Sequence, residues 1–413
     1  MFELKHCCFG KSVTLVLSLR ILHVAYIYPP ALKVADGITN VVYNVTKELA
    51  KRGHKVTVFA SNLADLHQTK LLPTGHYTVN GVDVFYFRSL LKYKTFMFTP
   101  SIINGLRDLD NFDVIHIHDA RSFQGICTYL WDKMKRVPYV FQPHGSFLSS
   151  MPESHNLRTL KLFLDKLVSS KIVKNASKII ALSRFEADQY KHVGVPEDKI
   201  AIIPNGIDLS GYANLPPKGA FKRKFGIPEE KKIILYLGRI HKTKGIDFLI
   251  KAYAHLINDT HHKDALLVIA GPDDGYLKEV KSLAQKLGIS SSILFTGLLY
   301  EDDKVRAYID SDVIVNVEPF NVYGLVPLEA TVCSKPVIVS KTNAISEVVA
   351  TGKFGYSVKY GSVTSLAFRL HQILNNGEMA EKLGRNGQRY VFNNLSWDKI
   401  IERYELVYRE VAK

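Results

Sequence analysis

The sequence predicts an α/β fold made of two Rossmann-like, doubly wound domains that face each other across a cleft. A length of 413 residues suits two domains, each large enough for its own core. Short apolar runs alternate with helix-like segments in two successive series, which is typical of parallel sheets with crossover helices. Because ligands of such folds bind at the carboxyl ends of the strands, we expect the functional site in the cleft.

The first series starts at Ile21. Residues 21–28 form an apolar run that ends at Pro29-Pro30, which indicates a buried strand. Apolar residues then recur at helical spacing from Val41 to Leu49, before a predicted strand at 55–59. We expect further strands at 114–118, 137–142 and 178–182, a helix over 156–173, and the end of this half at 201–208.

The second series follows residues 209–231, which contain Pro216-Pro217 and a basic cluster and are predicted to be a linker. It comprises expected strands at 233–237, 265–270, 293–296 and 313–317, and helices at 246–258, 277–287 and 302–310. The predicted organisation is therefore an N-terminal extension (1–20), a first domain (21–208), the linker (209–231), a second domain (232–390) and a C-terminal segment (391–413) with a helix over 397–411.

The first twenty residues are predicted to be a poorly packed extension, or the result of an upstream start, and not a targeting segment. Their apolar run, Val13 to Leu19, is too short to span a bilayer, and no small-residue cleavage site precedes the first strand. The four cysteines show neither metal-ligand spacing nor a disulfide framework, which favours a reduced, cytoplasmic compartment: Cys7, Cys8, Cys127 and Cys333.

The formal net charge of +15 is unevenly distributed. Residues 1–200 hold 26 basic and 16 acidic side chains, a balance of +10, and the remainder holds 28 and 23, a balance of +5. A basic N-terminal half fits a partner with phosphate, such as an anionic membrane surface, and a solvated basic surface explains it equally well. Because no basic motif is interleaved with aromatic residues, we expect no nucleic-acid partner.

The stretch from Glu318 to Ala330 reads E-P-F-N-V-Y-G-L-V-P-L-E-A and lies between two apolar, strand-like runs. Gly324 can open a helix that carries Leu325, Val326 and Glu329 in its first turns. Such a helix start presents unpaired N–H groups and the positive end of a dipole to whatever lies above the sheet. A carboxylate there can accept hydrogen bonds from sugar hydroxyls, so these four residues suit a ligand with phosphate and sugar parts.

A second candidate segment, L-G-R-I-H-K-T-K-G, spans residues 237–245 between a strand and a helix. Gly238 lets the backbone turn, and Arg239 and Lys244 can converge on one anionic group. Two cations at a strand end suit a diphosphate leaving group, whose negative charge grows as its bond breaks. The alternative is a pair of solvated surface cations.

These two segments resemble the donor-binding motifs of the retaining family-four glycosyltransferases of GT-B fold, the glycosyl transferases group 1. The family pattern is a Glu, seven residues, and a second Glu, which Glu329 matches. Counting back eight positions reaches Asn321, whereas Glu318 fills the first position if residues 321–323 are an insertion. The resemblance implies that Glu329 holds the ribose, that Arg239 and Lys244 hold the diphosphate, and that Glu318 or Asn321 contacts the sugar.

The resemblance spans nearly the whole chain. Gly37, in A-D-G-I-T-N, matches the family's glycine loop, and Q-P-H-G-S at 142–146 matches its His-Gly turn, which implies that His144 hydrogen-bonds the transferred sugar. A simple turn and a structural histidine are the alternatives. We expect His116 and His118 to be core or cleft-rim residues. In this family a helix like 397–411 crosses back onto the first domain.

The resemblance implies a hexosyltransferase-type enzyme that transfers a sugar, with retention and without metal or cofactor, from a nucleoside-diphosphate sugar to a glycan or lipid-linked acceptor. Arg239, Lys244 and helix N–H groups would supply the positive charge, and Asp273-Asp274 is expected to be an exposed turn. A nucleotide-sugar epimerase or synthase, or a non-catalytic sugar-nucleotide-binding module, remains an alternative. Basic residues along 158–174 flank an apolar stretch, which favours a cytoplasmic protein in peripheral contact with the inner face of the cell membrane. The alternative is a helix on the domain surface that packs these apolar residues inward.

Overall fold

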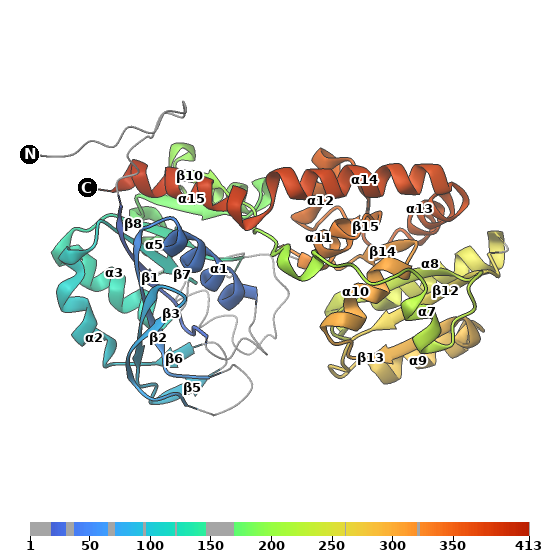
Figure 1. The fold of residues 1–413 in the computed structure, drawn as a ribbon, viewed down its shortest axis with the longest axis horizontal. Helices are drawn as coiled ribbons and strands as arrows, with labels where there is room; N and C mark the ends of the chain where they lie inside the picture. The colour runs from blue at the N-terminus through green and yellow to red at the C-terminus, as the bar shows by residue number, and fades with distance from the viewer. Residues whose placement is uncertain are drawn as a thin grey trace, which may run out of the picture.

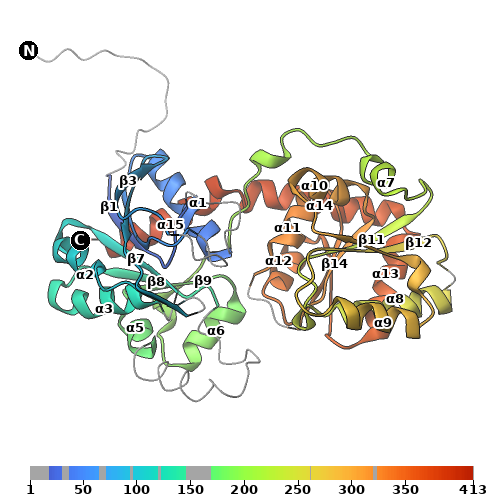
Figure 2. The same ribbon diagram turned by 90° about the horizontal axis from the view of Figure 1, so that it is seen from below.

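Two mainly parallel sheets, one in each half of the chain, organise the computed structural model (Figure 1). The structure describes residues 18–29, 37–64, 71–93, 96–119, 122–145, 169–260, 262–319 and 323–412. Within these residues the fold class expected from the sequence, two Rossmann-like α/β domains, is confirmed. Figures 1 and 2 show the domains side by side, with the last helices, in red, running along one side of both.

The N-terminal sheet has the strand order β10-β9-β8-β7-β1-β2-β4-β3. Its strands pair in parallel except β3, which pairs antiparallel with β4 at one edge. The strands are β1 (Arg20–Val24), β2 (Lys55–Ser61), β3 (Gly75–Val79), β4 (Val82–Phe87), β7 (Val114–His118), β8 (Tyr139–Gln142), β9 (Lys178–Ala181) and β10 (Ile200–Ile202). A separate antiparallel pair comprises β5 (Leu91–Tyr93) and β6 (Phe96–Phe98).

Both faces of this sheet are covered. One face packs on α1 (Gly37–Lys51) and on the C-terminal helix α15 (Trp397–Val411). The other packs on α2 (Ile102–Gly105), η2 (Leu106–Asn111), α3 (Phe123–Lys135), α5 (Ser170–Asn175) and α6 (Arg184–His192). The short turn η4 (Glu197–Lys199) leads into β10. Most residues on both faces are apolar, as expected for a sheet buried on both sides.

The C-terminal sheet has the order β13-β12-β11-β14-β15-β16, and all its pairs are parallel. Its strands are β11 (Lys232–Leu237), β12 (Ala265–Ala270), β13 (Ile293–Gly297), β14 (Val313–Asn316), β15 (Val337–Ser340) and β16 (Gly355–Val358). Helices α8 (Ile246–Thr260), α9 (Leu277–Lys286) and α13 (Val363–Asn375) pack on one face. The other carries α7 (Ala220–Phe225), α10 (Glu301–Asp310), α11 (Leu325–Val332), α12 (Ile345–Gly352) and α14 (Gly377–Asn394). Three short 3₁₀ helices, labelled η, are η5 (Ser210–Tyr212), η6 (Lys242–Lys244) and η7 (Ser290–Ser292).

Residues 209–231, predicted as a linker, contain more structure than that name implies. They include η5 and α7, and Phe221 of α7 is fully buried. The carboxylate of Asp310, at the end of α10, accepts hydrogen bonds from the backbone N–H groups of Gly219, Phe221 and Lys222. Most of the segment's second half is therefore an integral part of the C-terminal domain, anchored at the start of α7.

Helix α15 lies against the N-terminal domain. Arg52, just after α1, pairs with Asp398 and Glu405 of α15 at 2.8 and 2.9 Å. Deeper in the interface, the hydroxyl of Tyr404 donates to Gln142 at the end of β8. The chain passes between the domains twice, after β10 and between α14 and α15, and these two segments are in contact. The backbone N–H of Ile207 donates to the carbonyl of Leu395 at 2.8 Å.

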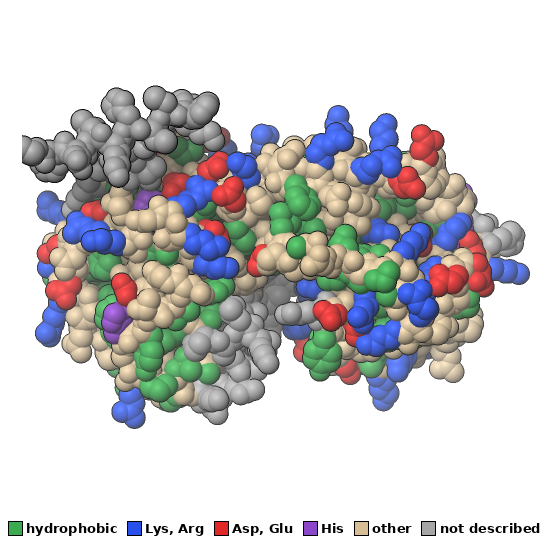
Figure 3. Space-filling view, viewed as in Figure 1, with side chains coloured by type: hydrophobic (Ala, Val, Ile, Leu, Met, Phe, Trp, Pro, Cys, Tyr) green, Lys and Arg blue, Asp and Glu red, His purple; other side chains and the backbone are tan. Residues whose placement is uncertain are grey.

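On the face shown in Figure 3, Lys and Arg side chains are spread over both domains and lie among Asp and Glu side chains. The positive charge on this face is therefore not gathered into a single patch. No helix in the described part of the chain is both long and apolar enough to cross a membrane. Most of the predicted amphipathic helix at 156–173 lies outside the described residues, which resume at Ser169.

Candidate active site

The first cluster of predicted site residues lies where the C-terminal sheet reverses its strand order. From β11 the sheet continues through β12 and β13 on one side and through β14, β15 and β16 on the other. Ligands of open parallel sheets bind at the carboxyl ends of the two strands that flank such a switch point. Arg239 and Lys244 follow β11, and Glu318 follows β14. The topology thus brings together residues that are 74 positions apart.

Lys244 and Glu318 form a direct ion pair across this switch point. The Lys244 ammonium donates to the Glu318 carboxylate at 2.5 Å, and the amide of Asn316 donates to the other carboxylate oxygen at 3.2 Å. The Glu318 side chain is only 6% exposed, against 23% for Lys244. A buried carboxylate needs such partners, because an unpaired charge away from water is costly.

A glycine allows the two loops to approach. Gly245 has φ +68°, and a Cβ at this position would lie 2.3 Å from the carbonyl oxygen of Val317. Only glycine fits this close contact and this backbone conformation without strain. The pairing of Lys244 with Glu318 therefore depends on the residue that follows Lys244.

Arg239 lies nearer to solvent. Its side chain is 62% exposed and forms an ion pair with Asp274 in the loop after β12. The neighbouring Asp273 is an exposed turn residue, as expected, and its carboxylate accepts backbone N–H groups of residues 275–277. These hydrogen bonds, chiefly that from Leu277, lower the pKa of Asp273. Among the described residues, the ion-pair partner of Arg239 is this partly exposed carboxylate, so a phosphate can compete for the guanidinium.

Glu329 occupies the fifth position of α11 and points toward α10. Lys304 donates to one of its carboxylate oxygens at 2.9 Å and Tyr308 donates to the other at 2.7 Å. Burial is the main cause of the raised pKa of Tyr308, and the nearby Glu329 carboxylate adds to it. The sequence pattern did not point to Lys304 or Tyr308, which lie on a different helix.

The start of α11 has the form expected from the sequence. Gly324 is its N-cap, with extended backbone and no side-chain capping bond, and Leu325 and Val326 are the first helical residues. Among the described residues no side chain therefore caps the N–H groups of the first turn. Asn321, the alternative to Glu318, lies outside the described residues.

The N-terminal domain supplies the remaining candidates. Gly37 is the first residue of α1, and His144 follows β8 in a turn with φ +53°. A left-handed backbone is uncommon for a residue with a side chain and requires support from its surroundings. That support includes Glu186 of α6, whose buried carboxylate accepts the backbone N–H of Gly145 at 2.8 Å. Burial raises the pKa of Glu186.

His144 is hydrogen-bonded to another histidine. Its Nε2 lies 2.9 Å from Nδ1 of His118, at the end of β7, and Nε2 of His118 lies 3.0 Å from Nδ1 of His23 on β1. Nδ1 of His116 is bonded to the hydroxyl of Tyr408 at 2.6 Å. Burial lowers the pKa of His23 and of His144 to about 3, so both are neutral at physiological pH.

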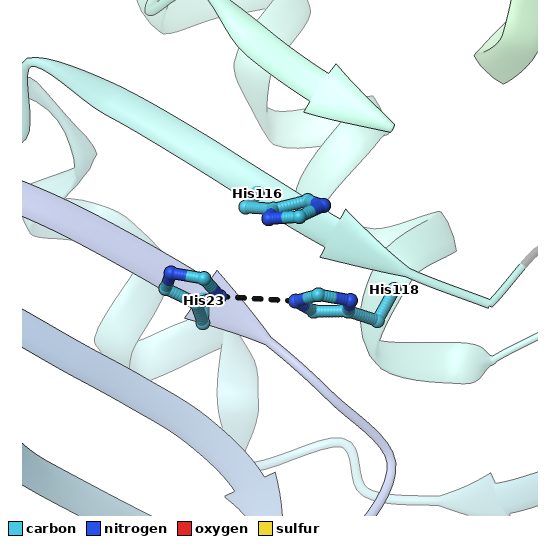
Figure 4. Close-up of side chains that lie close together, drawn as sticks. All are labelled: His23, His116 and His118. Carbon is cyan, nitrogen blue, oxygen red and sulfur yellow. Dashed lines mark hydrogen bonds between the residues drawn. The ribbon is translucent and has the colours of Figure 1, made fainter. Parts of the chain in front are cut away.

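Three of these histidines could also be considered as metal ligands. One nitrogen from each of His23, His116 and His118 lies within 4.8 Å of the others, and Figure 4 shows them on two neighbouring strands. However, His23 and His118 are hydrogen-bonded directly to each other, and Nδ1 of His116 is taken by Tyr408. These ring nitrogens are used in hydrogen bonds, so the arrangement favours a hydrogen-bonded cluster over a site for a metal ion. His116 and His118 are expected to be core or cleft-rim residues, and both are fully buried, which makes them core residues.

The two domains also touch through one carboxylate. Glu347 of α12 accepts the backbone N–H groups of Arg184 and Phe185 at the start of α6, at 3.0 and 3.1 Å. Carboxylates stabilise helix N-termini through such bonds and through the helix dipole. Because α6 also carries Glu186, this contact links the C-terminal domain to the turn that holds His144.

Comparison with known proteins shows the family of both halves of the chain. Residues 217–390 match the family Glycosyl transferases group 1, and residues 35–210 match Glycosyltransferase Family 4. An N-acetyl-alpha-D-glucosaminyl L-malate synthase of Bacillus anthracis is 26% identical, covering 89% of this chain and 92% of its own length. A D-inositol 3-phosphate glycosyltransferase of Streptomyces bingchenggensis is 25% identical, covering 95% and 88%.

Among solved structures, HepE of Anabaena in complex with UDP has a TM-score of 0.73 at 18% identity, covering 95% of this chain and all of that one. This likeness confirms the fold. The two family matches fall on the two Rossmann-like domains, one on each, and the relatives align over nearly the full chain. The chain therefore belongs to the group 1 glycosyltransferases and is a glycosyltransferase.

Proposed function

We propose that this glycosyltransferase moves a hexose from a nucleoside-diphosphate sugar to an acceptor hydroxyl, with retention at the anomeric carbon and without a metal ion. The observation that carries the proposal is the Lys244–Glu318 ion pair across the β11/β14 switch point. It provides a cation for a departing diphosphate and a buried carboxylate for sugar hydroxyls at the position where such folds bind ligands.

Residues around this ion pair supply the other proposed contacts to the nucleoside-diphosphate sugar. Arg239 is proposed to leave Asp274 for a phosphate, because a guanidinium offers a fork that matches phosphate oxygens. The open start of α11 adds N–H groups, and Glu329 is proposed to accept from the ribose hydroxyls. The complex of the similarly folded HepE contains UDP, which supports a nucleotide in this role.

In the proposed reaction the bond between the anomeric carbon and the phosphate oxygen breaks, and a bond to the acceptor oxygen forms on the same face. The proton of the acceptor hydroxyl passes to an oxygen of the departing phosphate. His144 is neutral, so it can hydrogen-bond the sugar without adding charge. Lys244 and Arg239 then carry the electrostatic stabilisation of the leaving group, the role a metal ion has in other transferases.

We propose an anionic acceptor that is lipid-linked, or a glycan precursor, presented at an anionic membrane surface. The balance of +10 in residues 1–200 supports this proposal. A small, soluble, anionic acceptor is the second candidate, because the names of two relatives specify L-malate and D-inositol 3-phosphate. Sedimentation with anionic liposomes separates the two: binding at low salt that weakens as salt rises supports the membrane, and no binding supports a soluble acceptor.

A panel of nucleoside-diphosphate sugars, screened by thermal stabilisation, identifies the donor first. A ligand at about 100 times its dissociation constant adds about 2.7 kcal/mol to the free energy of unfolding. With that donor, proton NMR of the product's anomeric signal should show retention, and EDTA should leave turnover intact. An inverted product or loss of turnover with EDTA contradicts the proposal, and donor turnover without an acceptor indicates an epimerase.

A further inference from the structure

The N-terminal sheet has a switch point of its own, at β1 and β7. From β1 the sheet runs through β2 and β4, and from β7 it runs through β8, β9 and β10. His23 of β1 pairs in register with His116 of β7, and His118 follows two residues later on the same face. This face is covered by α15, whose Tyr408 bonds His116. His23 and His116 thus lie buried beneath the switch point, and His118 stands at the carboxyl end of β7, the edge at which such a sheet places its ligand.

Three imidazoles form a continuous chain from the core to the candidate sugar contact. The chain runs from His23 through His118 to His144, with nitrogen–nitrogen distances of 3.0 and 2.9 Å. The rings are also close to parallel along it, with interplanar angles of 16° and 23°. His23 and His118 are fully buried, so water does not compete for these bonds.

The hydrogen bonds restrict the tautomers of all three rings. A neutral imidazole has one N–H and one lone pair, so it donates at one nitrogen and accepts at the other. In this chain every bond joins an Nδ1 to an Nε2. All three rings must therefore carry their proton on Nδ1, or all three on Nε2.

The inner end of the chain favours one of these states. Nε2 of His23 is buried and has no hydrogen-bond partner among the described residues. A buried N–H without a partner is rarer than a buried acceptor without one, which favours a bare Nε2 and an N–H on Nδ1. His23 then donates to His118, and His118 donates to His144. Since Nε2 of His144 is taken, its Nδ1–H is the group left for a ligand.

We propose that His118, supported by His23, is a positioning residue that fixes the ring and tautomer of His144, so that His144 meets the transferred sugar as a donor through Nδ1. This rests on the proposed function insofar as the ligand of His144 is a sugar. The proposal adds a role for two buried histidines that the donor-binding motifs do not include. It also specifies which atom of His144 contacts the sugar.

Nitrogen-15 labelling of histidine in the full-length protein tests the chain without any substrate. Long-range proton–nitrogen spectra at neutral pH distinguish protonated from bare ring nitrogens. We expect protonated Nδ1 and bare Nε2 in His23, His118 and His144. Different tautomers among the three rings would contradict the continuous row of hydrogen bonds. Protonated Nε2 in all three rings would contradict the proposed direction, in which His23 donates to His118 and His118 donates to His144. Stoichiometric zinc in the purified protein, bound by these rings, would also contradict the row of hydrogen bonds.

Kinetics test the positioning role. His118→Leu should lower kcat about 10- to 100-fold, the cost found when a metal-binding histidine loses the partner that orients it, with little change in the KM for the sugar donor. His118→Asn should recover part of kcat, because its amide reaches the position of Nδ1 and can still bond His144. His116→Leu is the matched control: it is equally buried and on the same strand, but it is bonded to Tyr408 and not to His144.

Parent-like kcat in a folded His118→Leu protein overturns the positioning role, as does an equal loss in His116→Leu. If His118→Leu does not fold, His118→Asn is compared with His116→Leu instead. Absence of sugar transfer by the parent protein, or full activity of His144→Ala, contradicts the proposed function. Neither result contradicts the hydrogen bonds that join His23, His118 and His144. The tautomer spectra of the unliganded protein still decide the hydrogen-bond pattern in that case.

Discussion

The two domains place polar groups at equivalent topological positions but give them opposite electrical character. At the C-terminal switch point, β11/β14, the groups are charged: Lys244 pairs with Glu318, and Arg239 lies beside them near solvent. At the N-terminal switch point, β1/β7, the groups are imidazoles that burial keeps neutral. One sheet thus offers fixed charge, and the other offers oriented hydrogen bonds without charge.

This difference matches the two parts of a sugar nucleotide. Negative charge develops on the departing diphosphate, where a nearby cation lowers the barrier. The sugar ring carries hydroxyl groups and positive character at the anomeric carbon, so a cationic histidine beside it would oppose the reaction. Under the proposed function, the same fold serves both halves of one substrate because the side chains at the two switch points differ in charge and not in placement.

Removing the cation of the charged switch point should have the largest effect. Lys244→Ala is expected to lower kcat about 10²-fold or more, the scale for losing one preorganised charge-stabilising group, and Arg239→Ala should behave similarly. Lys242→Ala is the matched control, since Lys242 lies in the same short helix η6 but its side chain is exposed. Near-normal turnover in folded Lys244→Ala and Arg239→Ala proteins would remove this segment from the mechanism.

Replacing Glu318, the carboxylate of the same ion pair, should have the second-largest effect on transfer. Glu318→Gln removes the charge that accepts from Lys244 and Asn316, and a hydrogen bond to a charged group is worth about 1.5–3 kcal/mol, so transfer should fall about tenfold or more. Asn321→Ala should have a much smaller effect on kcat and KM. The reverse ranking would assign the sugar contact to Asn321 and leave Glu318 with the structural task of holding Lys244.

At the neutral switch point, the turn that carries His144 can be loosened without touching a ring. Glu186→Gln keeps the size of the side chain but replaces one of two acceptor oxygens, which serve Gly145 and Leu182. A buried N–H left without its acceptor costs about 1–3 kcal/mol, so urea unfolding should show a loss of this size, with a lower kcat. Glu197→Gln, at an exposed carboxylate, is the control. Unchanged stability would mean that the His144 turn is held by other contacts.

Local pattern predicted the individual elements well where the chain is regular. The strands expected at 114–118 and 265–270 and the helix at 397–411 are observed at those residues, because apolar runs and helical spacing mark elements that are buried. Strand β3 was missed since its residues are almost all exposed and lack an apolar run. The aromatic β5–β6 hairpin was also not predicted.

Sequence reasoning was less complete for the site. Motif spacing pointed to Lys244, Glu329 and His144, and to Glu318 or Asn321, but it did not show which side chains contact one another. Lys304 and Tyr308 reach Glu329 from another helix, and His23 lies 95 positions from His118. Such pairings are set by the order of strands in the sheet. A sequence reveals which runs are strands more readily than it reveals which strands are neighbours.

The charge difference between the switch points should finally appear in the pH dependence of stability. His23 has an ordinary pKa near 6.5 when unfolded and about 3 in the folded protein, because burial disfavours the charged ring. Between these values the unfolded chain binds a proton that the folded chain does not. Stability should therefore fall as pH decreases from 6.5 toward 3, by up to about 1.4 kcal/mol per pH unit for this one imidazole. Replacing His23 by Leu removes that contribution, so the stability of His23→Leu from urea unfolding between pH 7 and pH 5 should decline less steeply than that of the parent. Equal slopes in the two proteins would show that His23 titrates alike in the folded and unfolded states, and the contrast between a neutral and a charged switch point would then be wrong.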